Sequence, residues 1–372
     1  MFAVLLLPAA FSIWFRYLTA KSRDKDQATK WIECRRVLHV IVLLTVPVWW
    51  SVFSDPSAQP SLLRYFPVWV VLLIPPVGAI FVAQRLAYWS DIRFLDRRWT
   101  PLNVFLLATW STVSFTIPLL MVAIGVQSIY DHNFIGILAI FLAGIVALIG
   151  AALLRSAEGF KPRAVKSGEL YKRSLVLSKR MDIHLRRVCV VPFGRGRLTN
   201  AYASWDEVSL TDDYGHWLHG AELDFVISHE LAHVKHRHAL KRLLAILGVF
   251  ALATVSAVVQ PHAIGAWRVF SNFAMILMPL AGLSLVSRRF EYEADRAAVE
   301  LTGEAEAGIR ALTNLYRRTA VPIRRSRFGQ LFSTHPSFSQ RIEAIARAGQ
   351  IPAERVSKLK EDFSQSAACN NS

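Results

Sequence analysis

The chain alternates long apolar stretches with shorter polar segments that are rich in Lys and Arg. An apolar helix needs about 20 residues to cross a bilayer. Stretches of about this length lie near residues 2–19, 37–53, 65–84, 102–126, 133–154, 240–260 and 263–286. Residues 2–15 also look like the core of a signal peptide, but no basic segment precedes them and no small-residue cleavage pattern precedes the basic segment at 21–25. The pattern predicts a mainly α, polytopic helical membrane protein that retains its first span.

The charges of the connecting loops predict how these spans are oriented. Loops with several Lys or Arg residues, at 16–36, at 85–98 and from Arg155 onward, alternate with residues 54–61 and 127–132, which contain none. Basic loops stay on the cytoplasmic side of a membrane. We therefore expect an integral, multi-pass protein of a bacterial inner membrane, with residues 155–238 in the cytoplasm.

Composition supports a lipid partner rather than a nucleic acid. The chain is 53% hydrophobic and carries a net charge of +16. Its Lys and Arg residues cluster in loops between apolar runs instead of forming one aromatic-studded surface, so we expect a lipid bilayer and no nucleic acid as partner. The three cysteines lie far apart and imply no disulfide framework.

The run His229-Glu230-Leu231-Ala232-His233 carries the clearest chemistry. Residues four apart share a helix face, so His229 and His233 can grip one metal ion. The flanking residues are apolar and predict a largely buried helix, in which the histidines need a partner such as a metal. Glu230 lies beside the open coordination position, where its carboxylate can take a proton from an attacking water. The pattern predicts a hydrolase with one Zn²⁺ ion per chain.

The third metal ligand is expected further along the chain. A metzincin would need Gly and His where this chain has His236 and Ala239, so that class is excluded. Glu291 and Asp295 are four residues apart and share a helix face. We expect Glu291 to be the third ligand and Asp295 to orient a ligand histidine through its free ring nitrogen. Glu293 points elsewhere on that helix and is the weaker ligand candidate.

These patterns divide the chain into domains. We expect an N-terminal membrane region of about five spans at 1–154, a zinc metalloprotease domain at 155–363 and a disordered tail at 364–372. A transmembrane hairpin at 240–286 interrupts the protease domain, so that the zinc helix runs through His238 into the membrane and the returning span delivers Glu291. An amphipathic helix near 167–182 and a small β-sheet precede the zinc helix. The expected strands are 188–191, 200–203 and 208–211.

The motifs together resemble a known family over residues 155–350. Four segments match its motifs in order, namely Thr199-Asn200-Ala201-Tyr202, the HExxHxxxxH run that ends at His238, the SRxxExxAD run from Ser287 to Asp295, and Thr334-His335-Pro336 with Arg341. The family is that of the membrane zinc metalloproteases, which includes the bacterial HtpX-like proteases and the CAAX prenyl endopeptidases, and the zinc-ligand set is of the gluzincin type. Trp205 stands where the family commonly has glycine.

The resemblance implies roles for individual residues. It implies that His229, His233 and Glu291 hold the zinc ion, that Glu230 is the general base, and that Asp295 supports the ligands from outside.

The same resemblance implies that Asn200, Ala201 and Tyr202 form an edge strand to which an extended substrate adds by main-chain hydrogen bonds. His335 would stabilise the developing oxyanion; the alternative is a His-Pro turn that caps a helix. We expect His236 and His238 to be solvent-exposed or interfacial histidines at the boundary between the zinc helix and the membrane.

The sequence thus predicts a membrane-embedded zinc metalloendopeptidase that cuts polypeptides, among them membrane proteins, at the cytoplasmic face during quality control. Alternatives are a dedicated processing protease for a lipidated or signalling peptide, and a signalling receptor with a protease domain. A non-catalytic transporter or scaffold would not need Glu230. An intramembrane protease is disfavoured, because charged residues flank the motif.

Overall fold

The computed structural model describes residues 161–192, 200–204, 206–212, 214, 217–245, 247–248, 266–319 and 333–359, with a few isolated positions before residue 150. The chain forms two compact units, Met1–Glu158 with Leu247–Leu280, and Gly159–Ile246 with Ala281–Ser372. Most of the second unit is described. The predicted spans before residue 155 and the tail at 364–372 lie almost entirely outside the described residues. Within the described residues, no helix combines the length and the apolar composition that a membrane crossing requires.

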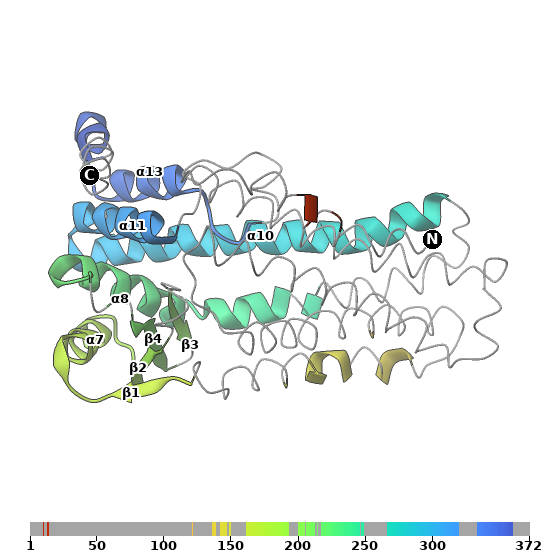
Figure 1. The fold of residues 1–372 in the computed structure, drawn as a ribbon, viewed down its shortest axis with the longest axis horizontal. Coiled ribbons are helices and arrows are strands. Elements are labelled where there is room, and N and C mark those ends of the chain that lie inside the picture. Colours follow the sequence, from red (N-terminus) through yellow and green to blue (C-terminus); the bar gives the residue numbers. More distant parts are fainter. Residues whose placement is uncertain are drawn as a thin grey trace. The chain divides into compact units, whose positions relative to one another are not determined.

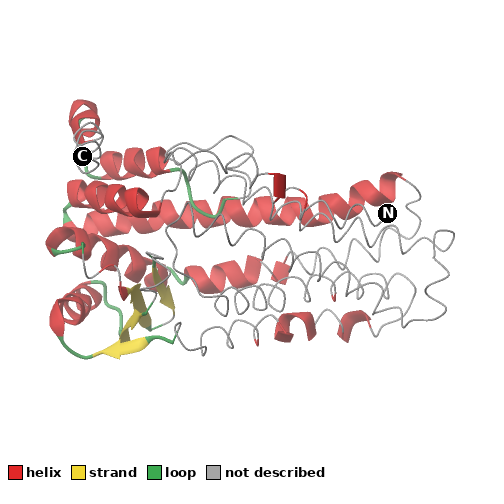
Figure 2. Ribbon diagram, viewed as in Figure 1, coloured by secondary structure: helices red, strands yellow, loops and turns green. Residues whose placement is uncertain are grey.

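The second unit is mainly helical and contains a small mixed sheet, as the sequence predicts (Figures 1 and 2). Strands β1 (Arg163–Val165), β2 (Arg187–Val191), β3 (Ala201–Ser204) and β4 (Glu207–Thr211) form a sheet in the order β1-β2-β4-β3. Strands β2 and β4 are parallel, and the other pairs are antiparallel. Helix α7 (Gly168–Arg180) lies between β1 and β2 along the chain. The three expected strands are present within a residue of their predicted bounds, whereas β1 was not predicted.

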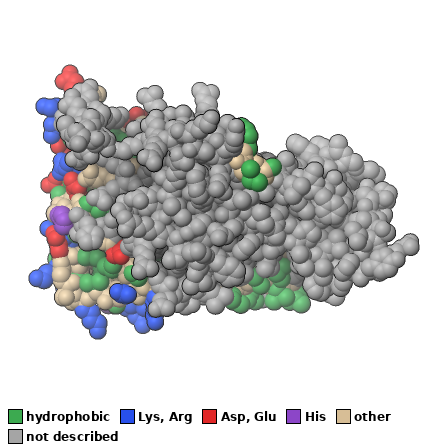
Figure 3. Space-filling view, viewed as in Figure 1, with side chains coloured by type: hydrophobic (Ala, Val, Ile, Leu, Met, Phe, Trp, Pro, Cys, Tyr) green, Lys and Arg blue, Asp and Glu red, His purple; other side chains and the backbone are tan. Residues whose placement is uncertain are grey.

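Four further helices complete the described part of this unit. They are α8 (Gly220–Lys235), α10 (Ala266–Thr302, of which the part from Ala281 belongs to this unit), α11 (Ala305–Thr319) and α13 (Phe338–Ala348). Charged side chains gather over the region that contains α7, α8 and α11 (Figure 3).

Helix α8 is central to two apolar clusters. Ile227 and Leu231 are fully buried in a cluster with α7 and the sheet, and Phe225 packs with residues of α10, α11 and α13 in the other. Gly308 allows α11 to approach α8 closely, because a Cβ at this position would lie 2.5 Å from the ring of Phe225. Burial on both sides fixes α8 in place, and α8 carries the predicted metal-binding motif.

The zinc helix ends earlier than the sequence predicted. We expected it to run unbroken through His238, but α8 ends at Lys235, and Arg237 adopts a left-handed conformation with φ 51°. A left-handed residue interrupts an α-helix because it breaks the repeat of backbone dihedral angles. A new helix resumes at His238. This break changes the direction in which His238 points.

Candidate active site

Helix α8 presents the two predicted histidine ligands on one face. Ile227 and Leu231 anchor the helix in the core, and residues four apart on it project in the same direction. His229 and Glu230 are each only 7% exposed, and His233 is half-buried. The HExxH run therefore lies where water has limited access.

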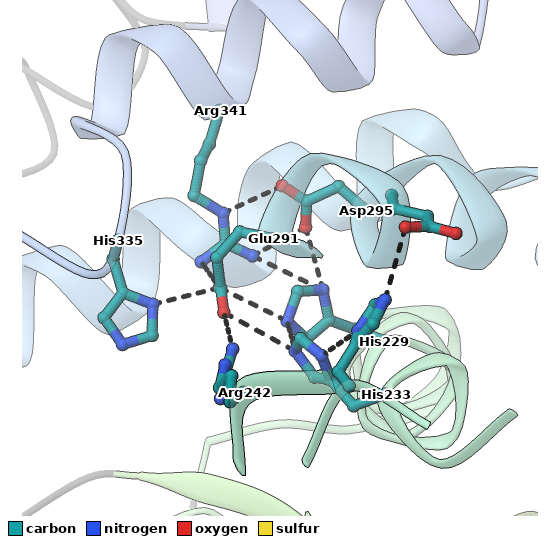
Figure 4. A network of polar contacts seen from close by, with 9 residues as sticks. His229, His233, Arg242, Glu291, Asp295, His335 and Arg341 are labelled. Carbon is teal, nitrogen blue, oxygen red and sulfur yellow. Dashed lines mark hydrogen bonds and ion pairs between the residues drawn. The ribbon is translucent and has the colours of Figure 1, made fainter. Parts of the chain in front are cut away.

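The donor atoms of the three predicted ligands converge (Figure 4). The Nε2 atoms of His229 and His233 are 3.2 Å apart, and they lie 3.6 and 3.5 Å from the carboxylate oxygens Oε2 and Oε1 of Glu291. A tetrahedral ion with bonds of about 2.0–2.1 Å separates its ligand atoms by roughly 3.3 Å. Two imidazole nitrogens and one carboxylate, whose two oxygens each approach one of these nitrogens at about this spacing, could together hold a single metal ion.

A charged clamp holds the first histidine. The Nδ1 atom of His229 lies 2.9 Å from Oδ1 of Asp295, and Arg341 donates two hydrogen bonds, of 2.8 and 2.6 Å, to the same carboxylate. Burial would raise the pKa of Asp295, but Arg341 and His229 lower it below its usual range, so the carboxyl is ionised. Burial would likewise lower the pKa of His229, but Asp295 and Glu291 outweigh burial and raise it to about 9. The ring of His229 is thus fixed with Nε2 facing the ligand cluster.

A different partner holds the second histidine. His238 is fully buried, and its Nδ1 atom lies 2.7 Å from Nδ1 of His233. Its ring stacks on that of Phe290, with the ring centroids 4.2 Å apart. Burial lowers the pKa of His233 to about 2 and the pKa of His238 to about 4, so both rings are neutral near pH 7. The interpretation of His238 as an exposed or interfacial residue is therefore wrong, because the break at Arg237 turns it into the core. His236 is partly exposed and forms an ion pair with Glu293.

Glu230 follows His229 directly on α8. Burial is the main cause that raises the pKa of Glu230 to about 7, although the positive charge of His229 opposes the shift. A carboxyl with a pKa near 7 can both take up and release a proton close to neutral pH.

The carboxylate of Glu291 lies at the centre of a positively charged cluster (Figure 4). His335 Nδ1 lies 3.0 Å from Oε2, Arg242 Nη2 lies 3.5 Å from Oε1, and Arg341 Nη1 lies 3.6 Å from Oε2. Burial would raise the pKa of Glu291, but His335, His229 and Arg341 hold it well below its usual range. Glu291 is consequently a permanent anion. The sequence analysis did not single out Arg242, since no motif contains it.

The predicted role of His335 can be compared with the capping alternative. The N-cap of α13 is Ser337, whose backbone N–H donates a 3.0 Å hydrogen bond to Oε1 of Gln340. His335 lies two residues before this cap, is 57% exposed and contacts Glu291 through its ring. The side chain therefore belongs to the ligand cluster instead of the helix cap.

The predicted substrate strand is the outermost strand of the sheet. Among the strands that the structure describes, β3 pairs with β4 alone, with Tyr202 opposite Ser209. Asn200, immediately before β3, accepts a 3.0 Å backbone hydrogen bond from Thr211. Ala201 packs against the apolar cluster beneath α8. Asn200, Ala201 and Tyr202 thus line the edge of the sheet, while Thr199 and Trp205 lie outside the described residues.

Comparisons with known proteins agree with this geometry. Residues 165–348 match peptidase family M48. The chain carries a peptidase family M48 domain.

Proteins named protease HtpX homolog are similar to about half of the chain. The one from Acaryochloris marina is 26% identical over 226 residues, which cover 50% of this chain and 74% of that protein, and the one from Campylobacter concisus is 29% identical over 217 residues, covering 49% and 74%. The crystal structure of S. mikatae Ste24p shares the fold, with a TM-score of 0.58 at 16% identity, over 92% of this chain and 98% of that one. The chain is a metallopeptidase that is similar to the HtpX proteases.

The buried clamp of the M48 domain predicts an asymmetry between two arginine–carboxylate pairs. Arg341→Ala should destabilise the protein by about 3–5 kcal/mol, because it leaves the carboxylate of Asp295 buried without its counter-charge. Arg355→Ala is the matched control. Arg355 also binds a carboxylate through two hydrogen bonds, of 2.7 and 2.8 Å to Glu306, but at the surface. This control should cost about 1 kcal/mol or less. Denaturant unfolding of the purified proteins measures both free energies. Equal losses of unfolding free energy in the two variants would contradict a buried, charge-compensating role for Arg341.

Proposed function

We propose that this metallopeptidase is a zinc endopeptidase that hydrolyses polypeptides at the cytoplasmic face of a membrane. The observation that carries the proposal is the convergence of donor atoms from His229, His233 and Glu291, two imidazoles and a carboxylate that suit one Zn²⁺ ion. In this proposal these three residues hold Zn²⁺, and the fourth position stays open toward substrate. Bound zinc supplies Lewis-acid chemistry, polarising the scissile carbonyl and making water more acidic.

The side chains around this site divide the remaining work. The carboxylate of Glu230 accepts a proton from the attacking water and then delivers it to the nitrogen of the departing amine. The ring of His335, which is 57% exposed and lies 3.0 Å from Glu291, donates a hydrogen bond to the oxyanion that develops on the carbonyl oxygen. Asp295, held by Arg341, keeps the Nε2 atom of His229 directed at the ion.

Substrate binds at the edge of the sheet in this proposal. An extended peptide adds to β3 through main-chain hydrogen bonds at Asn200, Ala201 and Tyr202. The position of β3 at the end of the strand order supports this mode. Main-chain binding recognises an extended backbone with little regard to side chains, which suits a protease with many polypeptide substrates.

Exposed apolar side chains near the site support a lipid bilayer as partner. Leu243 and Leu244 lie on the helix that resumes at His238, and Leu285 precedes Glu291 on α10. These leucines are 45%, 58% and 56% exposed. Large apolar side chains exposed on both chain segments next to the site are expected where the protein meets lipid. Together with the apolar stretches and the loop charges, they favour a multi-pass protein whose domains follow the predicted bounds, with the site on the basic, cytoplasmic side.

The physiological role we propose is quality control of membrane proteins. Dedicated processing of a lipidated or signalling peptide is the alternative. The two roles differ in the number of substrates, so proteins that accumulate in cells carrying Glu230→Gln discriminate them. Many unrelated membrane proteins support quality control, and a single species supports dedicated processing.

Metal binding tests the ligand set directly. Wild-type protein should hold about one zinc ion per chain, and His229→Ala, His233→Ala and Glu291→Ala should each lose it, because a catalytic site has three protein ligands. Glu293→Ala tests the other glutamate on the same helix; it should still hold about one zinc ion per chain at saturating zinc, because Glu293 is not a ligand. Metal analysis of detergent-purified protein measures the stoichiometry. If Glu291→Ala kept a full zinc ion and Glu293→Ala lost it, Glu293 and not Glu291 would be the third ligand.

Catalysis tests the general base separately from the metal. Glu230→Gln should keep zinc but lower peptide cleavage by roughly 10²–10⁴-fold or more, because the attacking water loses its proton acceptor. His335→Ala should keep zinc and lower turnover by roughly 10²-fold if His335 stabilises the oxyanion. Turnover of a fluorogenic peptide measures both. A Glu230→Gln enzyme within about threefold of wild type is incompatible with this mechanism.

Topology tests the cytoplasmic placement of the site. Reporter fusions after residues 30, 95 and 160 should report the cytoplasm, and fusions after residues 57 and 130 should report the outside, because basic loops remain inside. Paired reporters that are active on opposite sides of the membrane measure this. An external signal at residue 160 would overturn the cytoplasmic active site.

A further inference from the structure

The two histidines of the ligand cluster have unlike supports. His229 is held through Nδ1 by the ionised carboxylate of Asp295. His233 instead meets another imidazole, because its Nδ1 atom lies 2.7 Å from Nδ1 of His238. The series of hydrogen-bonded side chains continues from His238 to Glu293, since Nε2 of His238 lies 3.3 Å from Oε2 of Glu293. An imidazole thus occupies the place that a carboxylate has behind the other ligand.

The direction of each proton in this chain follows from the metal site. Nε2 of His233 faces the cluster at 3.2 Å from His229 and 3.5 Å from Glu291, so it must be unprotonated to bind metal. A neutral imidazole carries its single proton on the other nitrogen. Nδ1–H of His233 therefore donates to Nδ1 of His238, and Nε2–H of His238 donates to Glu293. Each imidazole proton in this series of hydrogen bonds then has a single position.

We propose that His238 is a positioning residue that fixes the tautomer and the ring orientation of His233 by accepting its Nδ1–H, with Glu293 fixing the tautomer of His238 in turn. The inference rests on the proposed metal site.

The surroundings hold His238 in this role. The ring is fully buried and stacks nearly parallel on Phe290, with an interplanar angle of 10°. The left-handed residue Arg237 ends α8 and brings His238 back beside His233, one turn earlier. Packing and backbone therefore both fix the acceptor at hydrogen-bond distance, and a partner outside the ligand set commonly contributes about 10–100-fold to metal affinity.

Two substitutions separate positioning from packing. His238→Phe keeps a flat ring that can stack on Phe290 but has no acceptor, whereas His238→Asn keeps an acceptor near the place of Nδ1 but leaves a cavity. Positioning predicts that His238→Phe weakens zinc binding about 10–100-fold and that His238→Asn weakens it less than about tenfold. A purely structural role predicts the reverse order.

The measurement is the zinc dissociation constant of the detergent-purified full chain, obtained by competition with a chelator. His236→Phe is the matched control. His236 also pairs with Glu293, at 3.2 Å, and its ring lies against that of His238. This control should bind zinc like wild type. If His238→Phe does not fold, His238→Leu against His238→Asn gives the same comparison at nearly equal size.

Each outcome bears on one proposal. Weaker binding in His238→Phe than in His238→Asn supports the positioning role. Equal affinities, or the reverse order, overturn it, while loss of zinc in His229→Ala still upholds the metal site. Wild-type protein that binds no zinc overturns the proposed function itself.

Discussion

The site depends on the burial of two carboxylates one turn apart on α10. Glu291 and Asp295 are 2% and 1% exposed, and an ionised carboxylate cannot be buried without compensation. Arg341 neutralises Asp295 from α13, and the histidines of α8 face both acids. Helices α8, α10 and α13 are therefore tied together by charge as well as by apolar packing. The same negative charge that must be compensated makes the cluster a good receptor for a cation.

The positive groups around Glu291 explain how the cluster can exist before a cation arrives. His335, Arg242 and Arg341 all lie within 3.6 Å of its carboxylate. In the proposed metal-bound state, an ion would take over part of this compensation, and the more exposed of these side chains would become available to substrate. His335 and Arg242 reach Glu291 from outside the buried clamp, whereas Arg341 is only 7% exposed. The pair of Arg341 and Asp295 is thus the fixed part of the network, whereas His335 and Arg242 are its more exposed part.

The sequence predicted those parts of the site that depend on a short repeat. The spacing of His229 and His233, and of Glu291 and Asp295, follows from residues four apart on a helix, and the structure brings all four together. The expected strands were found because their apolar residues are contiguous. The site of His238 could not be predicted, because it depends on one left-handed residue, Arg237, in a run that reads as continuous helix. Arg242 was missed because it lies beside Lys241 at the start of an apolar segment and belongs to none of the motifs. Strand β1 was missed because three residues are too short to show alternation.

The position of Arg341 has a consequence for the order in which the protein is made. Synthesis proceeds from the N-terminus, and domains begin to fold as they emerge. The metal-binding residues all precede Arg341, which is the partner that stabilises the ionised form of Asp295. Until α13 has been synthesised, burying Asp295 is unfavourable, and the orientation of His229 is not secured. The support that Asp295 gives to His229 is therefore complete only once α13 is present.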